Sequence, residues 1–236
     1  MPLRHEPDMR QLPLGVRLRD RASFTSFVAG ANAEAVRHVS ELAGGERGGC
    51  AWLHGPEGSG KTHLLQAACA RAAVCARAGY VPLAEFSQGD PVVLDGWRDL
   101  DCVCIDDLQT VAGSRPWDEA LFRIFRDFEE RGARLIVAAS EPPGALGWSL
   151  RDIASRFAAA PVFALQPLDE AGRLEALRLR AHLRGVDLPD ETVRFLQRRF
   201  PRDMQTLYRL LDTLDDAALA AQRRLTVPFV RGVLGG

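Results

Sequence analysis

Lys61 is the only lysine among the 30 Lys and Arg residues of the chain, and it stands in a glycine-rich segment. The segment fits G-x-x-x-x-G-K-[ST], a pattern whose backbone N–H groups turn inward around phosphates. In so tight a loop a slim ammonium reaches the terminal phosphate oxygens, whereas a planar guanidinium fits poorly. The predicted nucleotide contacts in this loop are Gly55, Pro56, Glu57, Gly58, Ser59, Gly60, Lys61 and Thr62.

The neighbours of this loop are those that a phosphate site requires. Residues 50–54 form a short apolar run typical of a buried strand, and residues 63–78 form an Ala- and Leu-rich run typical of a helix. Strand, loop and helix in this order distinguish a nucleotide site from a chance glycine-rich turn. The positive N-terminus of the helix favours phosphate, and Thr62 can place its hydroxyl on Mg²⁺. His63 flanks the loop and is predicted to lie near the nucleotide, with core or surface packing as the alternative.

A second apolar run, residues 100–107, ends in two acids. At the carboxyl end of a strand, Asp106 is predicted to hold Mg²⁺ through water, and Asp107 to polarise an attacking water or complete the metal shell. Ser140 follows the next apolar run. Two roles fit it: a polar group that orients water near the γ-phosphate, or a serine that caps the segment after the strand.

The composition narrows the class of protein. The chain has 236 residues, 47% of them apolar, and a net charge of −1, so it can bury a large core and carries no basic field for nucleic acid. No run is long and apolar enough to span a membrane, and the charged N-terminus lacks a secretion signal. Cys102 and Cys104 fall on one predicted strand and face the same side; the five cysteines are expected to be free thiols of a reducing cytosol.

Short apolar runs alternate with helical patterns in the first two thirds of the chain, which predicts an α/β fold with a parallel five-stranded sheet flanked by helices. The predicted strands are residues 50–54, 80–84, 101–105, 134–139 and 161–165. After Pro167 only helical patterns remain. We therefore expect three parts: an N-terminal tail (1–20), a nucleotide-binding α/β domain (21–167) and a small helical lid domain (168–236).

Two arginines stand where charge could act on a nucleotide. Arg156 lies on a predicted helix ahead of the last strand, from which it could project into a neighbouring subunit's nucleotide. Arg202 lies at the start of a helix in the second domain, from which it could fold over this chain's own nucleotide. A lone arginine is more often a surface charge, so both hypotheses depend on position.

Taken together, these residues resemble an AAA+ module of the branch that contains the bacterial replication initiator DnaA and the Hda family, which inactivates that initiator. The initiator pattern is carried by residues 60–64, 105–107, 140–143 and 155–157, and the stretches similar to Hda are residues 80–83, 103–106, 183–185 and 225–230. The resemblance implies the AAA+ fold, bound ADP or ATP with Mg²⁺, and a trans role for Arg156.

The tail adds a further resemblance. Gln11, Leu12, Leu14 and Val16 are similar to the Gln-Leu-x-Leu-x-Leu peptide by which that family docks on the DNA-polymerase sliding clamp, with valine in place of the last leucine. The two leucines would fill apolar pockets while the glutamine supplies hydrogen bonds. A tail that contains Gln-Leu by chance is the alternative.

The expected function is a bacterial cytoplasmic regulator, brought to the nucleoid by the clamp, that stimulates ATP hydrolysis by DnaA. No sequence-specific DNA binding is expected, and a homo-oligomer stays open. Because Lys61, Thr62, Asp106 and Asp107 are all present, weak ATPase activity of the chain itself also stays open. The alternatives are a self-contained AAA+ ATPase and a replication factor of the helicase-loader type.

Overall fold

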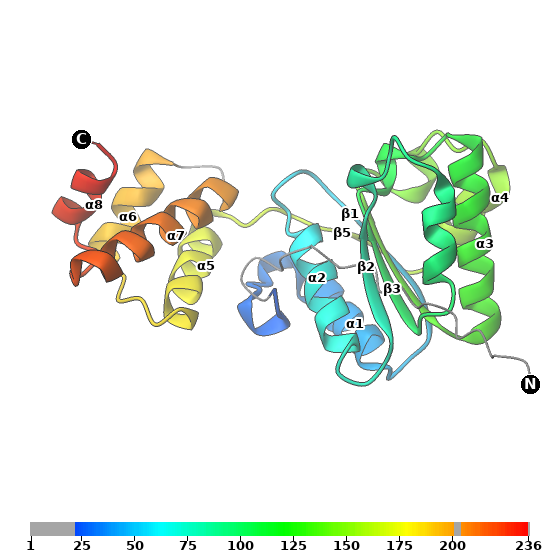
Figure 1. Ribbon diagram of the computed structural model, residues 1–236, viewed down its shortest axis with the longest axis horizontal. Coiled ribbons are helices and arrows are strands. Elements are labelled where there is room, and N and C mark those ends of the chain that lie inside the picture. Colours follow the sequence, from blue (N-terminus) through cyan, green and yellow to red (C-terminus); the bar gives the residue numbers. More distant parts are fainter. Residues whose placement is uncertain (1–21, 201–203, 236) are drawn as a thin grey trace, which may run out of the picture.

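The structure is a computed structural model that describes residues 22–200 and 204–235 (Figure 1). A five-stranded sheet forms the centre of its larger part. The strand order is β2-β3-β4-β1-β5, and every neighbouring pair is parallel. The strands are β1 (Gly49–His54), β2 (Ala78–Pro82), β3 (Cys102–Asp106), β4 (Arg134–Ala139) and β5 (Val162–Ala164). The predicted parallel sheet is confirmed.

Helices cover both faces of the sheet, as parallel strands require. In Figure 1, α1 and α2 lie on one side of the strands and α3 and α4 on the other. These helices are α1 (Ala33–Gly44), α2 (Lys61–Ala72), α3 (Arg115–Arg131) and α4 (Arg151–Ala159). Short 3₁₀ turns connect them: η1 (Phe24–Ser26), η2 (Gly30–Asn32), η3 (Leu83–Glu85), η4 (Pro91–Trp97), η5 (Leu108–Thr110) and η6 (Pro143–Ala145).

Side chains alternate across the sheet and so build two cores. On β3, Cys102 and Cys104 pack in the core under α1 and α2, whereas Val103 and Ile105 pack in the core under α3. The predicted common side of the two cysteines is confirmed, and the five cysteines form no disulfide. Burial raises the pKa of the Cys69 thiol to about 11, so it is protonated at neutral pH.

The described part of the C-terminal region consists of helices and the loops between them, and it has its own core, which lies to the left in Figure 1. Its helices are α5 (Glu170–Leu183), α6 (Asp190–Arg199), α7 (Met204–Ala221) and α8 (Val227–Val233). Leu177, Val193, Leu196 and Leu211 are almost completely buried among them. In the described ranges, no helix has the length and apolar character needed to cross a membrane.

The structure corrects two predicted boundaries. The helix predicted to reach residue 78 ends at Ala72, and the strand predicted over 80–84 is Ala78–Pro82. The cause is tertiary: Ala78 pairs with Cys102 in the sheet, and this pairing overrides the helical propensity of the alanine-rich segment. Strand β3 likewise includes Asp106, so the first of the two acids belongs to the sheet itself.

Candidate nucleotide-binding site

The phosphate loop joins the carboxyl end of β1 to the first turn of α2, and its glycines are required by its shape. Gly60 has φ +93°, and a Cβ there would lie 2.7 Å from a ring carbon of Phe27. A Cβ on Gly55, which has φ +150°, would lie 2.4 Å from the carbonyl oxygen of Leu165. Larger residues are therefore excluded at both positions, and the loop stays tightly curled.

Lys61 is the first residue of α2 and curls back over the loop. Its Nζ donates to the carbonyl oxygens of Gly55 at 2.7 Å and Pro56 at 2.9 Å. Burial lowers the pKa of Lys61, and the carboxylates of Asp106 and Asp107 oppose that shift. The single ammonium of the chain is thus held in the mouth of the loop and within electrostatic reach of both predicted metal acids.

The loop fits a bound phosphate in two further respects. Gly60 caps α2 without any side-chain hydrogen bond, so the first N–H groups of the helix are available to an anion. Ser59 is buried, and its hydroxyl has no hydrogen-bond partner among the described residues. Phosphate oxygens would satisfy such donors. Here Lys61 and the helix N-terminus would hold the phosphates, and Thr62 with Asp106 would hold Mg²⁺.

Asp106 is a buried carboxylate, only 1% exposed, at the carboxyl end of β3. It accepts hydrogen bonds from the hydroxyl of Tyr80 at 2.9 Å, from the backbone N–H of Asp107 at 3.0 Å and from the side chain of Thr62. Burial raises the pKa of Asp106, while the hydrogen bond from Thr62 lowers it. Thr62 of α2 and Asp106 of β3, the two residues predicted to bind the metal, are therefore in contact.

Asp107 and Ser140 are linked by a residue that the sequence did not point out. Gln109 donates from its amide to Oδ1 of Asp107 at 3.1 Å, and its carbonyl oxygen accepts the backbone N–H of Ser140 at 3.1 Å. Asp107 itself has φ +55°, in the left-handed region. The following turn η6 takes Pro142 as its N-cap, so Ser140 does not cap it, and its exposed hydroxyl stands at the end of β4.

His63 fastens the segment before α1 to the phosphate loop. Its Nε2 lies 3.2 Å from the carbonyl oxygen of Ser23 and 3.1 Å from Oγ of Ser26, and its ring meets the Phe27 ring edge-on at 5.2 Å. Burial lowers the pKa of His63, so the neutral ring is favoured. Its role here is to position residues 23–27 beside Gly60.

Arg156 lies at the opposite end of the strands from this loop. It lines a depression together with Gly49 and Cys50, which begin β1, whereas the phosphate loop follows the end of β1. Its Nη1 donates to Oε2 of Glu129 at 2.7 Å, and its guanidinium stands 5.2 Å from the centre of the Phe122 ring. The sequence did not point to either partner, because Arg156 lies on α4 and its partners lie on α3, and only the fold brings the two helices together.

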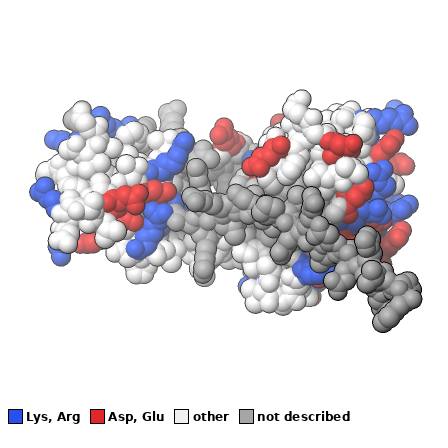
Figure 2. Space-filling view, in the orientation of Figure 1, with Lys and Arg blue, Asp and Glu red and all other residues white. Residues whose placement is uncertain are grey.

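Five of the predicted functional residues lie outside the described part of the chain: Gln11, Leu12, Leu14, Val16 and Arg202. The charged surface of the described part is mixed in sign. Figure 2 shows basic and acidic side chains interspersed among the described residues of this face.

The C-terminal helical region, α5 to α8, matches a known protein family. Residues 169–234 match the family described as "Hda, lid domain". This region is similar to Hda lid domains. Its match covers α5 to α8, and the resemblance to the DnaA and Hda branch of AAA+ proteins is confirmed there and in the fold.

The chain is also similar in structure to domain III of the replication initiation protein DnaA from Thermotoga maritima. The TM-score is 0.78 at 23% identity, over 92% of this chain and 96% of that one. AMPPCP-bound DnaA from Aquifex aeolicus gives 0.68 at 21% identity, over 84% of this chain and 66% of that one. The Thermotoga maritima RuvB Holliday junction branch migration motor gives 0.63 at 16% identity, over 90% and 73%. At these identities the likenesses show the fold alone.

Proposed function

We propose that this chain is a nucleotide-binding regulator of replication initiation that docks on the sliding clamp and makes ATP-bound DnaA hydrolyse its ATP. The observation that carries the proposal is the separation of two groups. Lys61 lies at the carboxyl end of β1, and Arg156 lies beside the start of the same strand. An arginine in that place serves a nucleotide bound by another subunit.

The chemistry asked of Arg156 is electrostatic. A guanidinium presented from a neighbouring subunit stabilises the charge that develops on the transferring phosphoryl group, an effect of roughly 10³- to 10⁵-fold in rate. The side chain is 39% exposed, and among the described residues its contacts are with Glu129 and Phe122 of α3, so it can reach a partner without unfolding the domain. The match to the Hda lid domain family supports DnaA as that partner.

The chain's own nucleotide, ADP or ATP with Mg²⁺, is proposed to occupy the phosphate loop. It would supply the charge that organises the loop, while Lys61, Thr62 and Asp106 hold it. The AMPPCP named for the Aquifex aeolicus structure supports an adenine nucleotide. Clamp docking is assigned to the tail peptide of Gln11, Leu12, Leu14 and Val16, which would keep the regulator in the bacterial cytoplasm near replicating DNA.

Hydrolysis by purified ATP-bound DnaA on clamp-loaded DNA tests this function. The parent chain is expected to stimulate hydrolysis. Arg156→Ala is expected to lose at least about 100-fold of that stimulation, a lower bound on the roughly 10³- to 10⁵-fold effect of a trans arginine. Arg151→Ala, an exposed arginine at the start of the same helix, is the matched control and should stimulate like the parent. Normal stimulation by Arg156→Ala would remove the central residue of the proposal.

A self-contained ATPase is the second candidate, and the intact link from Asp107 through Gln109 to Ser140 favours it. Such an arrangement can orient an attacking water at the chain's own site. Turnover of ATP by the purified chain alone, lost in Asp107→Asn, would establish this activity. If that turnover is present while DnaA hydrolysis is unaffected, the self-contained reading replaces the regulatory one.

A further inference from the structure

A pocket of about 470 Å³ opens at the amino-terminal ends of the strands, next to Arg156. It lies under the starts of β1 and β4 and the segment that leads into β5. Its lining is largely apolar: Cys50, Phe125, Phe128 and Leu135 form the floor, and the exposed Ala159 and Pro161 lie at the rim. Burial raises the pKa of the Cys50 thiol, so no charge enters the floor from that residue.

Two arginines, Arg156 and Arg47, line the pocket together with one acid, Glu129. His38 also lines it, and burial lowers the pKa of this histidine, which favours the neutral ring. Glu129 is already paired with Arg156, and Arg47 is paired with Glu41 at 2.6 Å. Phosphate charge that a partner brings to the pocket would be complementary to Arg156 and would compete with Glu129 for its guanidinium.

The position of the pocket excludes a role with the chain's own nucleotide. Strand β1 has 6 residues and separates the pocket from the phosphate loop. At about 3.3 Å per residue, the two ends of the strand are roughly 20 Å apart. A group in this pocket would therefore come from outside the chain and would lie beside Arg156.

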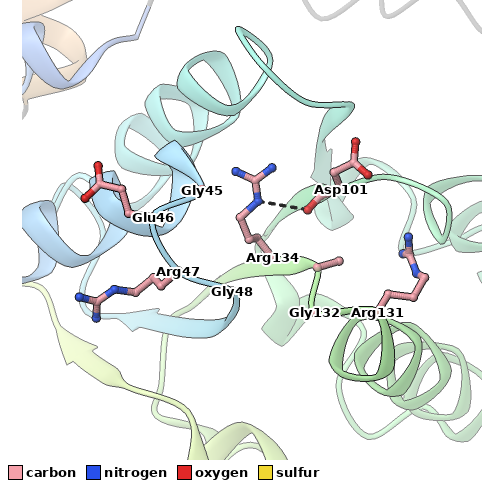
Figure 3. Close-up of a pocket in the computed structure, with 9 residues that line it drawn as sticks. Gly45, Glu46, Arg47, Gly48, Asp101, Arg131, Gly132 and Arg134 are labelled. Atoms are coloured by element: carbon pink, nitrogen blue, oxygen red, sulfur yellow. Dashed lines mark hydrogen bonds between the residues drawn. The ribbon is translucent and has the colours of Figure 1, made fainter.

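A neighbouring depression of about 500 Å³ does not compete for this role (Figure 3). Two of its three arginines already serve the fold. Arg134 donates to the backbone oxygens of Asp101 and Ala43, and Arg131 donates to the backbone oxygens of Arg98 and Leu100. These contacts hold together the loops at the sheet edge.

We propose that the pocket beside Arg156 receives an apolar side chain of the same ATP-bound AAA+ subunit whose nucleotide Arg156 serves. The inference rests on the proposed function, and makes pocket and arginine one docking surface. Seating one Leu- or Phe-sized side chain would favour the complex by about 10- to 100-fold in affinity. The pocket thus supplies affinity, and Arg156 supplies rate.

The test is to fill the pocket from its rim. Ala159→Trp places a large ring at a residue that lines the pocket and is exposed, so folding is retained. We expect the concentration of full-length chain needed for half-maximal stimulation of ATP-bound DnaA to rise at least about 10-fold, with the maximal rate unchanged. Ala158→Trp, equally exposed but outside the pocket lining, is the control and should shift this concentration less than 2-fold, well under that ~10-fold effect.

The outcomes separate this inference from the function on which it rests. If Arg156→Ala loses stimulation and Ala159→Trp behaves like Ala158→Trp, the pocket does not receive the partner. In that case the inference about the pocket is wrong, while the proposed function stands. If Arg156→Ala stimulates normally, the proposed function fails and the inference falls with it. An unchanged thermal shift with nucleotide in both tryptophan variants shows that the fold and the phosphate loop are intact.

Discussion

Nη1 of Arg156 lies 2.7 Å from Oε2 of Glu129, so the arginine proposed to act on a partner is held by an acid of its own chain. The side chains of Arg156 and Glu129 are 39% and 58% exposed. A pair so open to water contributes only about 0.2–1 kcal/mol. The contact therefore orders Arg156 against α3, and a phosphate group, which carries more charge, can displace the carboxylate.

Glu129→Gln should make Arg156 easier to recruit. The substitution keeps the shape of the side chain and removes the charge that the arginine must leave. We expect half-maximal stimulation of DnaA at a concentration about 1.4- to 5-fold lower, because about 0.2–1 kcal/mol no longer opposes the exchange. The maximal rate should stay the same. Titrations of DnaA hydrolysis against the regulator measure both quantities.

The neighbouring acid gives the control. Glu130 pairs with Arg126 at 3.5 Å and is also well exposed, so Glu130→Gln makes the same change of net charge without touching Arg156. It should leave the titration where it was. A higher half-maximal concentration for Glu129→Gln would instead mean that Glu129 helps to orient Arg156 for the partner, and the prediction would be wrong.

Lys61→Ala should abolish stabilisation by nucleotide. At 100 times its dissociation constant, a ligand that binds only the folded state stabilises by about 2.7 kcal/mol, or roughly 5–10 °C in a domain of this size. Lys61→Arg is the informative companion, because it keeps the charge. Both variants should lose most of the shift, since a planar guanidinium does not fit the curl between Gly55 and Gly60. Thermal unfolding with and without ATP or ADP measures it; a full shift in Lys61→Arg would show that charge alone suffices.

The sequence was most informative where a local pattern determines the structure. The phosphate loop and the acids at the end of β3 could be predicted because their chemistry needs adjacent residues. The contacts of Tyr80 and Gln109 with these acids could not, because they depend on which strands become neighbours in the sheet. A polar hydroxyl in the otherwise apolar strand β2 was the one signal that could have pointed to Tyr80. The same dependence on topology explains why Arg156 was expected at a subunit edge but its partner Glu129 was not.

The tail peptide can be tested without disturbing the fold. Deleting residues 1–16 should abolish association with the sliding clamp and leave the thermal shift with nucleotide unchanged. Leu12→Ala with Leu14→Ala should have nearly the same effect, since each leucine is expected to fill an apolar pocket. Leu3→Ala lies in the same tail outside the peptide and should bind normally. Clamp binding of unchanged affinity after the deletion would exclude this peptide as the docking element.

The hydrogen bond between Tyr80 and Asp106 should make stability depend on pH in a way that identifies the carboxylate. Tyr80→Phe removes the donor 2.9 Å from Oδ2 of Asp106 and changes little else in the buried strand. A hydrogen bond to a charged group contributes about 1.5–3 kcal/mol. Tyr80→Phe should therefore lose about that much of the free energy of unfolding once Asp106 is ionised, and much less while it is protonated.

The direction of this pH dependence follows from the pKa of Asp106, which burial raises above 3.8. Such a carboxyl binds its proton more tightly in the folded state, so it favours folding at low pH and that contribution is lost as pH rises through the folded pKa. Without the Tyr80 hydroxyl the pKa rises further, so the deficit of Tyr80→Phe should be smallest near pH 4 and grow toward pH 8. Urea unfolding without nucleotide, followed by fluorescence of tryptophans such as Trp52 in the same domain, measures it. A deficit independent of pH would assign the loss to packing, and the buried charge at Asp106 would no longer explain it.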